Sequence, residues 1–356
     1  MHQATYTGDR TVLVRPCAAV PPAAGQVRID VAFTGICGTD LHILHGAMDA
    51  RVSPPTVLGH EMSGRIAEVG AGVTGWQRGD PVTVMPTASC GDCPACGAGH
   101  THLCHRLDFL GIDSAGAMQN SWTVPAELLV RLPEGLRLDR AALVEPTAVA
   151  VHDVRRCALA ADEQAVVVGA GPVGVLIALV ARRVGADVLV VEPDAHRRST
   201  AEKLGLACID PSVTDVVAAV ESRTGGAGAA VAFEVSGAAA GAASAVACLR
   251  ARGRLVLVAI HPTPREVDLH RFFQRELTLL GARLYHREDF EEAVRLLAAG
   301  EIPVDGLVSR IEPLARADAA FAALDSGALD SGALDSGAGV MKVLVDCRPT
   351  DGTESA

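Results

Sequence analysis

Two regimes of hydrophobic patterning divide the chain. From Val12 to about Leu132, short apolar runs are broken about every eight to fifteen residues by Gly or Pro. This pattern predicts short β-strands joined by loops, in a partly closed β-rich unit. Near Leu143 to Cys157 the apolar positions change to helical spacing, and strand and helix patterns then alternate. Alternation of this kind predicts an α/β unit built on a parallel sheet.

The second unit contains a series of predicted buried strands. The segment 165–193 predicts a strand, a glycine turn, a helix and a second strand, and further strands are predicted at 230–237, 252–260 and 277–283. After them, 287–302 predicts an amphipathic helix and 340–346 a strand that returns the C-terminus to the first unit. We therefore expect one unit formed by 1–151 and 286–356, and a second unit formed by 152–285.

Composition narrows the class of protein. A chain of 356 residues with 49% hydrophobic composition is long enough for two cores. Lys and Arg number 31 against 42 Asp and Glu, giving a net charge of −11 without a basic stripe, which argues against nucleic acid or an anionic membrane as partner. The sequence shows neither a signal peptide nor a membrane span, so the ten cysteines are expected to stay reduced in the cytoplasm.

A glycine turn predicts a dinucleotide site. The motif follows an apolar strand and precedes a helix, and Glu192 ends the next strand, eighteen residues past the third glycine; its glycines are Gly169, Gly171 and Gly174. The glycines let backbone amides approach a pyrophosphate, and Glu192 can accept hydrogen bonds from the ribose. Glu192 would repel a 2′-phosphate and so favours NAD over NADP, although Arg197 and Arg198 follow closely. A strand-turn-helix without a ligand is the alternative.

The segment "SCGDCPACGAGHTHLC" holds a compact set of four cysteines, Cys90, Cys93, Cys96 and Cys104. Four thiolates on one loop suit a tetrahedral structural Zn²⁺ with no open position, so this site is not expected to bind substrate. A C-x-x-C redox pair is the alternative. Three nearby histidines could replace a thiolate but are expected to be solvated; they are His100, His102 and His105.

A second candidate metal set is dispersed along the chain, at Cys37, His60, Glu61 and Glu145. One thiolate, one imidazole and one carboxylate make three protein ligands, the number that leaves a catalytic zinc open to water or substrate. Composition alone does not establish this set, because a single Cys in an apolar strand is usually just buried.

The motifs resemble those of one family. In order they are "GICGTD" with a following His, "GHE" with "SG", the four-cysteine loop, "VEP" and "GAGPVG". From about Val27 to Asp346 the chain resembles the zinc-dependent medium-chain alcohol dehydrogenases, and within them the sorbitol (polyol), butanediol and L-threonine 3-dehydrogenase branch. The resemblance implies an α/β fold, with an N-terminal GroES-like β-rich catalytic domain and a Rossmann coenzyme domain.

The resemblance also assigns zinc ligands. Cys37 and His60 match the family's catalytic zinc ligands. Glu61 matches the zinc-ligating glutamate of the polyol branch, whereas Glu145 stands where classical members have a cysteine ligand. We expect Glu61 to be bound at rest, with Glu145 close enough to coordinate or to exchange through water. Asp40 matches the carboxylate that orients the zinc-bound histidine, and a loop-capping role is its alternative.

Further roles follow from the resemblance. Thr39 matches the residue that hydrogen-bonds the reacting hydroxyl, and His42 matches a histidine that passes the proton outward; a turn residue and a surface histidine are the alternatives. Val173 beside the pyrophosphate and Arg197 near the adenine are expected to contact the coenzyme.

Together these assignments predict oxidation of a secondary alcohol on a polyol, diol, cyclitol or amino alcohol, with two zinc ions and NAD. L-Threonine 3-dehydrogenase, a primary-alcohol or aldehyde reductase, and a zinc- and NAD-binding protein without turnover are the alternatives. We expect a homotetramer, or alternatively a homodimer.

One repeat matches no motif of the family. "ALDSGALDSGALDSG" spans Ala323 to Gly337 in three copies of five residues. Three copies are too few to build a stacked core, so we predict a duplicated loop with a frayed helix end; a functional repeat is the alternative.

Overall fold

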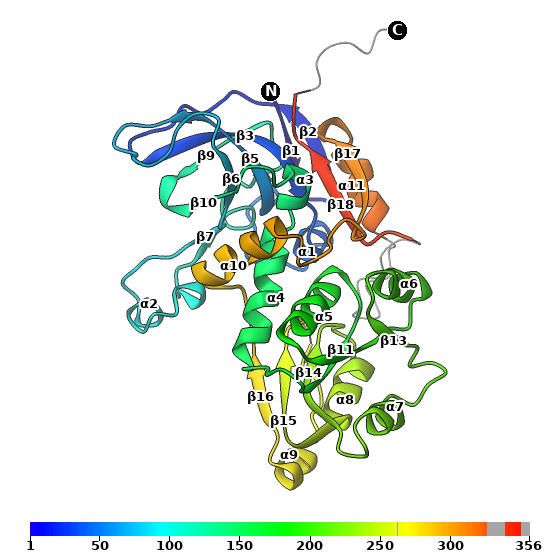
Figure 1. The fold of residues 1–356 in the computed structure, drawn as a ribbon. Coiled ribbons are helices and arrows are strands. Elements are labelled where there is room, and N and C mark those ends of the chain that lie inside the picture. Colours follow the sequence, from blue (N-terminus) through cyan, green and yellow to red (C-terminus); the bar gives the residue numbers. More distant parts are fainter. Residues whose placement is uncertain (262, 326–338, 350–356) are drawn as a thin grey trace.

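The computed structural model describes residues 1–261, 263–325 and 339–349. Figure 1 shows two parts, with helix α4 (Val144–Arg156) running from one toward the other. The first part is rich in strands and holds both the N-terminus and the last strand. The second part is a sheet covered by helices.

The first part contains a seven-stranded sheet in the order β10-β6-β5-β3-β18-β17, with β9 paired to β3, and a three-stranded sheet in the order β2-β1-β4. Strands β7 and β8 pair as a two-stranded ladder, and the four-cysteine loop lies between them in the sequence. The strands are β1 (His2–Tyr6), β2 (Val12–Pro16), β3 (Gln26–Gly35), β4 (Thr56–Val57), β5 (Glu61–Val69), β6 (Pro81–Val84), β7 (Thr87–Ala88), β8 (Asp108–Phe109), β9 (Ser121–Pro125), β10 (Leu129–Arg131), β17 (Val308–Pro313) and β18 (Lys342–Asp346).

Short helices join these strands. They are α1 (Gly38–Leu44), α2 (Pro94–Gly97), α3 (Leu138–Ala141), α10 (Arg287–Ala298) and α11 (Ala317–Leu324), with 3-10 turns η1 (Thr101–Leu103), η2 (Ala126–Leu128) and η3 (Leu314–Arg316). Helix α10 is the amphipathic helix that the sequence predicts, and its apolar residues are buried against α4.

The second part is a six-stranded parallel sheet in the order β13-β12-β11-β14-β15-β16. Its strands are β11 (Gln164–Val168), β12 (Asp187–Val191), β13 (Ala207–Ile209), β14 (Ala229–Glu234), β15 (Leu249–Leu257) and β16 (Thr278–Gly281), and its helices are α5 (Pro172–Val184), α6 (Ala195–Lys203), α7 (Val216–Arg223), α8 (Ala239–Ala247) and α9 (Leu269–Arg275). The strand order reverses between β11 and β14, where ligands bind in sheets of this type.

Strand β11 shows why both faces of this sheet need helices. Ala165 and Val167 are buried in one core cluster with residues of α4, α5 and α10, whereas Val166 and Val168 are buried in another with residues of α7 and α8. Since successive strand residues point to opposite faces, a continuous apolar run requires cover on both sides. The predicted α/β unit with a parallel sheet is confirmed.

The C-terminal strand returns to the first part, as the sequence predicts. Strand β18 pairs antiparallel with β3, with Leu344 opposite Gly35, and parallel with β17. The predicted boundary between 151 and 152 lies inside the continuous helix α4, and the domain limits stay a prediction. Among the described residues, no helix is both long and apolar enough to cross a membrane. The Ala-Leu-Asp-Ser-Gly repeat lies mostly outside the described residues; its first residues, Ala323 and Leu324, end helix α11.

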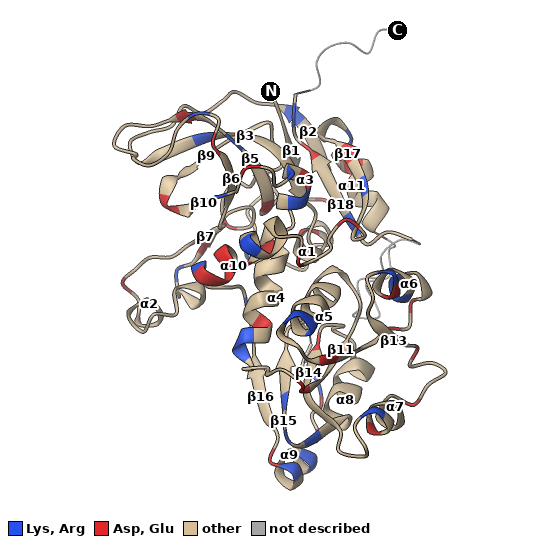
Figure 2. Cartoon of the chain, in the orientation of Figure 1, with Lys and Arg blue, Asp and Glu red and all other residues tan. Residues whose placement is uncertain are grey.

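Charges are interspersed over both parts. In the view of Figure 2, basic and acidic residues are scattered over both parts, with acidic residues at the start of α10 and basic residues on α9. Many of them pair locally, for example Arg295 with Glu292 at 2.8 Å.

Candidate functional site

The register of two strands builds the dispersed metal set. Cys37 lies just after β3, at the N-cap of α1, and His60 directly precedes Glu61, the first residue of β5. Strands β3 and β5 pair antiparallel with Gly35 opposite Glu61, so the end of one strand meets the start of the other. One ligand atom from each of Cys37, His60 and Glu61 lies within 4.8 Å of the other two. The pairing of β3 with β5 thus brings Cys37 close to His60 and Glu61, although more than twenty residues separate them in the sequence.

Asp40 caps α1 and also lies beside His60, the position that its proposed role in orienting the histidine requires. Its Oδ2 accepts the backbone N–H of Cys37 at 2.9 Å and so caps α1, while its Oδ1 lies 3.8 Å from His60 Nδ1. Burial opposes protonation of His60, but the Asp40 carboxylate and the Cys37 thiol outweigh it and raise the pKa of His60 to about 10. Asp40 therefore fixes the start of the helix and faces the ring nitrogen of His60.

Glu61 is paired with a buried lysine that the motif analysis did not single out. Lys342 on β18 donates to Glu61 Oε1 at 2.6 Å and to the carbonyl of Ile36 at 2.9 Å. Burial opposes the charged form of Lys342, but the Glu61 carboxylate raises its pKa. A Cβ at position Gly35 would lie 2.1 Å from Glu61 Oε2, so this glycine makes room for the carboxylate. A lysine inside an apolar strand was the available signal, since buried lysines are almost always paired.

Glu145 lies near the set but outside it. It is buried in the first turn of α4. Burial and the charge of Glu61 raise its pKa to about 7, against the opposing charge of His60. Tyr285 is buried beside it, with a hydroxyl that has no hydrogen-bond partner among the described residues; burial and the Glu145 carboxylate raise the pKa of Tyr285 well above its usual range. Tyr285 is a second residue that the sequence analysis missed.

The donor set fits a zinc ion. A thiolate, an imidazole and a carboxylate are the ligands that zinc takes in proteins, and three of them leave one position open. Glu61 Oε2 is buried and accepts no hydrogen bond from any residue the structure describes, although Lys342 lies within ion-pair distance. A buried carboxylate is costly unless a cation lies beside it, and Lys342 is that cation when Glu61 holds no metal.

Helix α1 carries the two residues expected to handle the proton. Thr39 and His42 are half-buried and stand three residues apart, on neighbouring turns. Burial and the charge of His45 lower the pKa of His42. His45, for which the sequence suggested no role, places Nε2 3.0 Å from Asp325 Oδ2 and so contacts the C-cap of α11.

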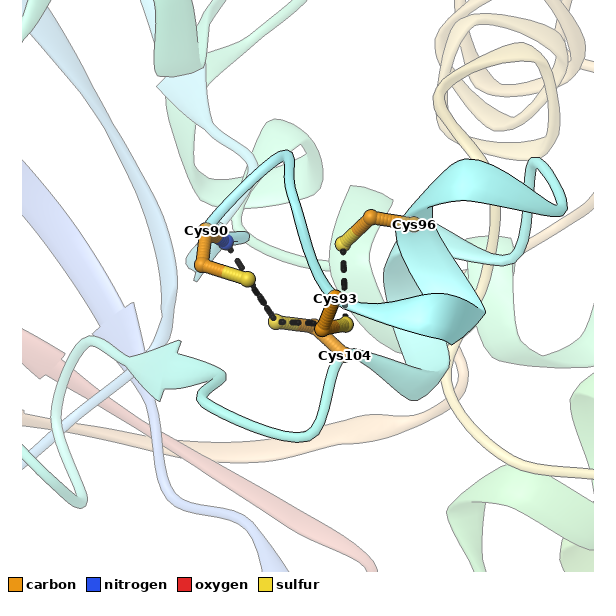
Figure 3. Close-up of side chains that lie close together, drawn as sticks. All are labelled: Cys90, Cys93, Cys96 and Cys104. Atoms are coloured by element: carbon orange, nitrogen blue, oxygen red, sulfur yellow. Dashed lines mark hydrogen bonds between the residues drawn. The ribbon is translucent and has the colours of Figure 1, made fainter.

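The four cysteines converge on one loop. Figure 3 shows their sulfurs pointing toward one another, from Cys90, Cys93, Cys96 and Cys104. All four sulfurs lie within 4.8 Å of one another, with Cys93 Sγ 3.5 Å from Cys96 Sγ. Backbone N–H groups of His105 and Arg106 donate to Cys93 Sγ and Cys104 Sγ at 3.5 and 3.3 Å. Such donors stabilise thiolates. The hydrogen bonds to Cys93 Sγ lower the pKa of Cys93 to about 6, and the largest contribution comes from the backbone N–H of His105.

The expectation for one loop histidine is wrong. His102 is buried rather than solvated, with its ring centroid 4.1 Å from that of His286 and 5.1 Å from that of His152. Burial, together with the neighbouring histidines, lowers its pKa to about 4. His152 in turn contacts Asp289 at 2.9 Å. This cluster docks the loop on α4 and α10, a contact between distant segments that local sequence does not reveal.

The three glycines of the turn are required for different reasons. Gly169 has φ +106°, and a Cβ at Gly174 would lie 2.0 Å from the Gly169 carbonyl oxygen. Gly171, the N-cap of α5, has an ordinary φ of −63°, and a Cβ there would meet nothing within 4 Å among the described residues. Backbone conformation explains Gly169 and close packing explains Gly174, whereas the open space at Gly171, at the N-terminus of α5, suits a pyrophosphate. Val173, in the first turn of α5, is half-buried.

Glu192 is buried at the end of β12. Its Oε2 accepts the backbone N–H of Ala170 at 2.6 Å and its Oε1 that of Asp194 at 2.9 Å. Arg198 turns back to the carbonyl of Glu192 and to Asp210, at 2.8 and 2.9 Å. Arg197 lies in the first turn of α6, where its N–H donates to the capping Asp194 at 2.7 Å. The carboxylate is thus fixed beside the glycine turn, and Arg198 is engaged elsewhere.

Family comparison agrees with the two parts. Residues 23–134 match the alcohol dehydrogenase GroES-like domain, and residues 172–299 match the zinc-binding dehydrogenase domain. Together the matches span more than half of the chain. The predicted arrangement, a GroES-like part followed by a Rossmann-like part, is confirmed.

Curated relatives match over nearly the whole length. The chain is 48% identical over 347 residues to 2-dehydro-3-deoxy-L-galactonate 5-dehydrogenase of Pseudoalteromonas atlantica, covering 98% of this chain and 99% of that protein. It is 34% identical over 295 residues to L-galactonate-5-dehydrogenase of Escherichia coli, covering 83% and 86%. It is 36% identical over 324 residues to (R,R)-butanediol dehydrogenase of Bacillus subtilis, covering 87% and 92%.

Solved structures show the same fold. A zinc-binding dehydrogenase, so described, of Sinorhizobium meliloti bound to NADP aligns with a TM-score of 0.90 at 30% identity, covering 97% of this chain and 98% of that one. The 2R,3R-butanediol dehydrogenase of Bacillus subtilis aligns with a TM-score of 0.86 at 31% identity, covering 98% and 99%.

Proposed function

The chain belongs to the zinc-dependent medium-chain alcohol dehydrogenases, oxidoreductases that act on CH–OH groups, and from this premise we propose which residues carry the reaction. The proposal is that a secondary alcohol of a polyhydroxylated small molecule is oxidised to a ketone at Cys37, His60 and Glu61. One observation carries it: the ligand atoms of the half-buried Cys37 and the buried His60 and Glu61 converge within 4.8 Å, separately from the four-cysteine loop.

Two zinc ions are proposed for each chain. Cys37, His60 and Glu61 would hold the catalytic ion, with Glu145 near enough to replace Glu61 or to act through water. Cys90, Cys93, Cys96 and Cys104 would hold the structural ion, since four thiolates leave no position for substrate. Held by these residues, zinc would supply a Lewis acid for the alcohol oxygen, and the coenzyme would supply the hydride acceptor.

The proton leaves along helix α1 in this proposal. The Thr39 hydroxyl accepts the proton of the substrate hydroxyl while donating its own toward His42. Because burial lowers the pKa of His42, its imidazole is neutral near pH 7 and free to accept that proton. Asp40 holds His60 in one orientation throughout, and Lys342 keeps Glu61 in place when the carboxylate is not on the metal.

NAD is the proposed coenzyme, with NADP second. The pyrophosphate would lie at Gly169, Gly171 and Gly174, with Val173 beside it, and Glu192 would accept hydrogen bonds from the ribose. Two observations support NAD: the buried Glu192 carboxylate would repel a 2′-phosphate, and Arg198 is paired with Asp210. Arg197 is proposed to lie near the adenine. The similar Sinorhizobium meliloti structure holds NADP, so NADP stays a competing coenzyme.

The relatives do not fix the substrate. Their names include galactonates, butanediol, sorbitol and, for Pyrococcus furiosus, L-threonine. L-Threonine oxidation is therefore the second candidate, at 34% identity over 81% of this chain. A primary-alcohol or aldehyde reductase, as the sequence also allowed, ranks below it because the names of the galactonate 5-dehydrogenases and of the butanediol dehydrogenase point to secondary hydroxyl groups.

We further propose a homo-oligomer, a tetramer or alternatively a dimer. The edge strand β16 and the neighbouring helix α9 expose apolar side chains, Leu269, Phe273 and Leu279. An open parallel edge with apolar cover is a ready surface for a second copy.

We propose a cytoplasmic protein. None of the ten cysteines, all of which lie among the described residues, forms a disulfide, as is usual for proteins of that reducing compartment.

A substrate panel tests the proposed function. The zinc-loaded protein is mixed with NAD or NADP and with polyols, diols, cyclitols, aldonates, primary alcohols and L-threonine, and NAD(P)H absorbance is followed. We expect turnover with secondary alcohols and NAD. Turnover confined to primary alcohols, or none with any alcohol, would overturn the proposal.

A further inference from the structure

Helix α1 carries a stripe of polar side chains along one side. Thr39, His42 and His45 follow at intervals of three residues, and all three are half-buried, whereas the four residues between them are buried. The backbone N–H of His45 donates to the carbonyl of Leu41 at 3.0 Å, so the helical path continues to His45. Side chains three residues apart on a helix are neighbours, with about 5–6 Å between their Cβ atoms. The stripe therefore begins beside Cys37 and leads along the helix through His42 to His45.

The two ring nitrogens of His45 have different surroundings. Nε2 lies 3.0 Å from Oδ2 of Asp325, the C-cap of α11. An ionised carboxylate can only accept hydrogen bonds, so in neutral His45 the proton is on Nε2 and Nδ1 is left as an acceptor. Nδ1 is buried and has no hydrogen-bond partner among the residues that the structure describes. His45 therefore offers an unpaired proton acceptor on the helix that carries His42.

Asp325 links His45 with solvent. Its side chain is 28% exposed, whereas that of His45 is only 9% exposed. A proton that reaches the carboxylate can therefore pass to water, while the ring itself is largely shielded. His42 suits the step before, because burial, and then the charge of His45, lower its pKa. Protonated His42 thus gives up its proton readily.

Resting on the proposed function, we propose that His45 and Asp325 carry the proton of the alcohol from His42 to solvent. For each hydride that the coenzyme accepts, one proton passes from Thr39 to His42 and from His42 to His45 Nδ1. The ring then releases its Nε2 proton to Asp325 Oδ2, and Asp325 releases it to water. Rotation of the ring and exchange with water return His45 to its starting tautomer. Both residues act through His42 rather than on the reacting atoms.

Release of the proton straight from His42 to water is the competing path, since His42 is half-buried rather than enclosed. The two paths need different residues. Direct release uses neither His45 nor Asp325, whereas the relay stops if either of them can no longer take up a proton.

The test follows proton release and hydride transfer within one turnover. The zinc-loaded protein with NAD is mixed with the best secondary alcohol of the panel, and NADH absorbance and the colour of a pH indicator are recorded by stopped flow. His45→Gln and Asp325→Asn are compared with the wild type and with two controls, His2→Gln and Asp318→Asn, whose native side chains are exposed. Asp318 lies on the same helix as Asp325. In the wild type and the controls, we expect the proton and NADH to appear together.

In both relay variants, proton release should slow by on the order of tenfold or more and lag behind NADH formation. A dissolved base should replace the lost residue in part. Raising the HEPES concentration at constant pH and ionic strength should therefore speed steady-state turnover of His45→Gln and leave that of the wild type unchanged. Zinc content, NADH affinity and thermal unfolding of the variants should equal those of the wild type.

Proton release at the wild-type rate in His45→Gln would overturn the relay and identify direct release from His42 as the path. Slower turnover that comes with lost zinc or weaker NADH binding, and that buffer does not restore, would overturn it too, since His45 would then be structural. A wild type that oxidises no alcohol would instead refute the proposed function, and the relay with it.

Discussion

Lys342 Nζ lies 2.6 Å from Glu61 Oε1, and both side chains are almost fully buried. The pair joins β18, from the end of the chain, to the first residue of β5. A buried ion pair is weak evidence for stability in itself, but removing one partner leaves a charge without compensation. The pair therefore gives the proposed metal ligand an alternative partner inside the fold.

Replacing the lysine tests this relationship. In the metal-free protein, Lys342→Met should lower the free energy of unfolding by about 3–5 kcal/mol, because the Glu61 carboxylate is left buried and unpaired. Lys342→Arg should lose less, since it keeps the charge. Zinc should reduce the loss in Lys342→Met, because the ion neutralises the same carboxylate. Urea unfolding with and without a chelator measures all three, and a loss that zinc does not reduce would contradict the shared role of Glu61.

Asp153 predicts a pH effect on stability. Both of its carboxylate oxygens are buried on α4 without a hydrogen-bond partner among the described residues. Burial, followed by the charge of Asp289, raises its pKa well above 3.8. The stability that its protonated form contributes is complete below pH 3.8 and is lost as the pH rises through the raised pKa.

The variant Asp153→Asn should not show this loss of stability with rising pH, because its amide does not ionise. Between pH 3.8 and the raised pKa, the wild type should lose up to about 1.4 kcal/mol per pH unit relative to the variant. Urea unfolding of both proteins at pH 5, 6, 7 and 8 gives the difference directly. A difference that stays constant with pH would show that Asp153 ionises in the folded protein.

Glu192 predicts the choice of coenzyme. Glu192→Gln keeps an acceptor for the Ala170 N–H but removes the charge that faces a 2′-phosphate. A like-charge contact at about 4 Å is worth on the order of 1–4 kcal/mol, so the ratio of kcat/KM for NADP to that for NAD should rise about tenfold or more. Initial rates with both coenzymes measure the ratio. No change would mean that the carboxylate does not face the 2′ position.

Replacing Cys93 should reduce the stability of the fold rather than remove a residue that takes part in the reaction. Cys93→Ser removes one of four converging thiols, so the chain should bind one zinc fewer and lose on the order of several kcal/mol of stability. Metal analysis and thermal unfolding check both. A variant that keeps full stability but has no turnover would place the chemistry at this loop.

The sequence predicts well what local pattern encodes. The glycine turn, the alternation of strands and helices and the cysteine spacing are each contained in one short segment, and each is found in the fold. Cys37, His60 and Glu61 were brought together by resemblance, and the antiparallel register of β3 and β5 supplies the physical reason.

Contacts between distant segments were not predictable in the same way. Lys342 and Tyr285 reach the site from segments without a motif, and His102 is buried only because α4 and α10 pack against its loop. Lys342 left a signal, a charge inside an apolar strand. The burial of His102 left none, because a histidine in a polar loop has the same sequence whether or not another helix covers it.

Zinc content and turnover of Cys37→Ser, measured beside the wild type and Cys93→Ser, test the central claim most directly. We expect about two zinc ions in the wild type, and about one in Cys37→Ser, which should stay folded and lose turnover with every secondary alcohol. Wild-type turnover by a Cys37→Ser protein that has lost no zinc would contradict the assignment of the reaction to Cys37, His60 and Glu61.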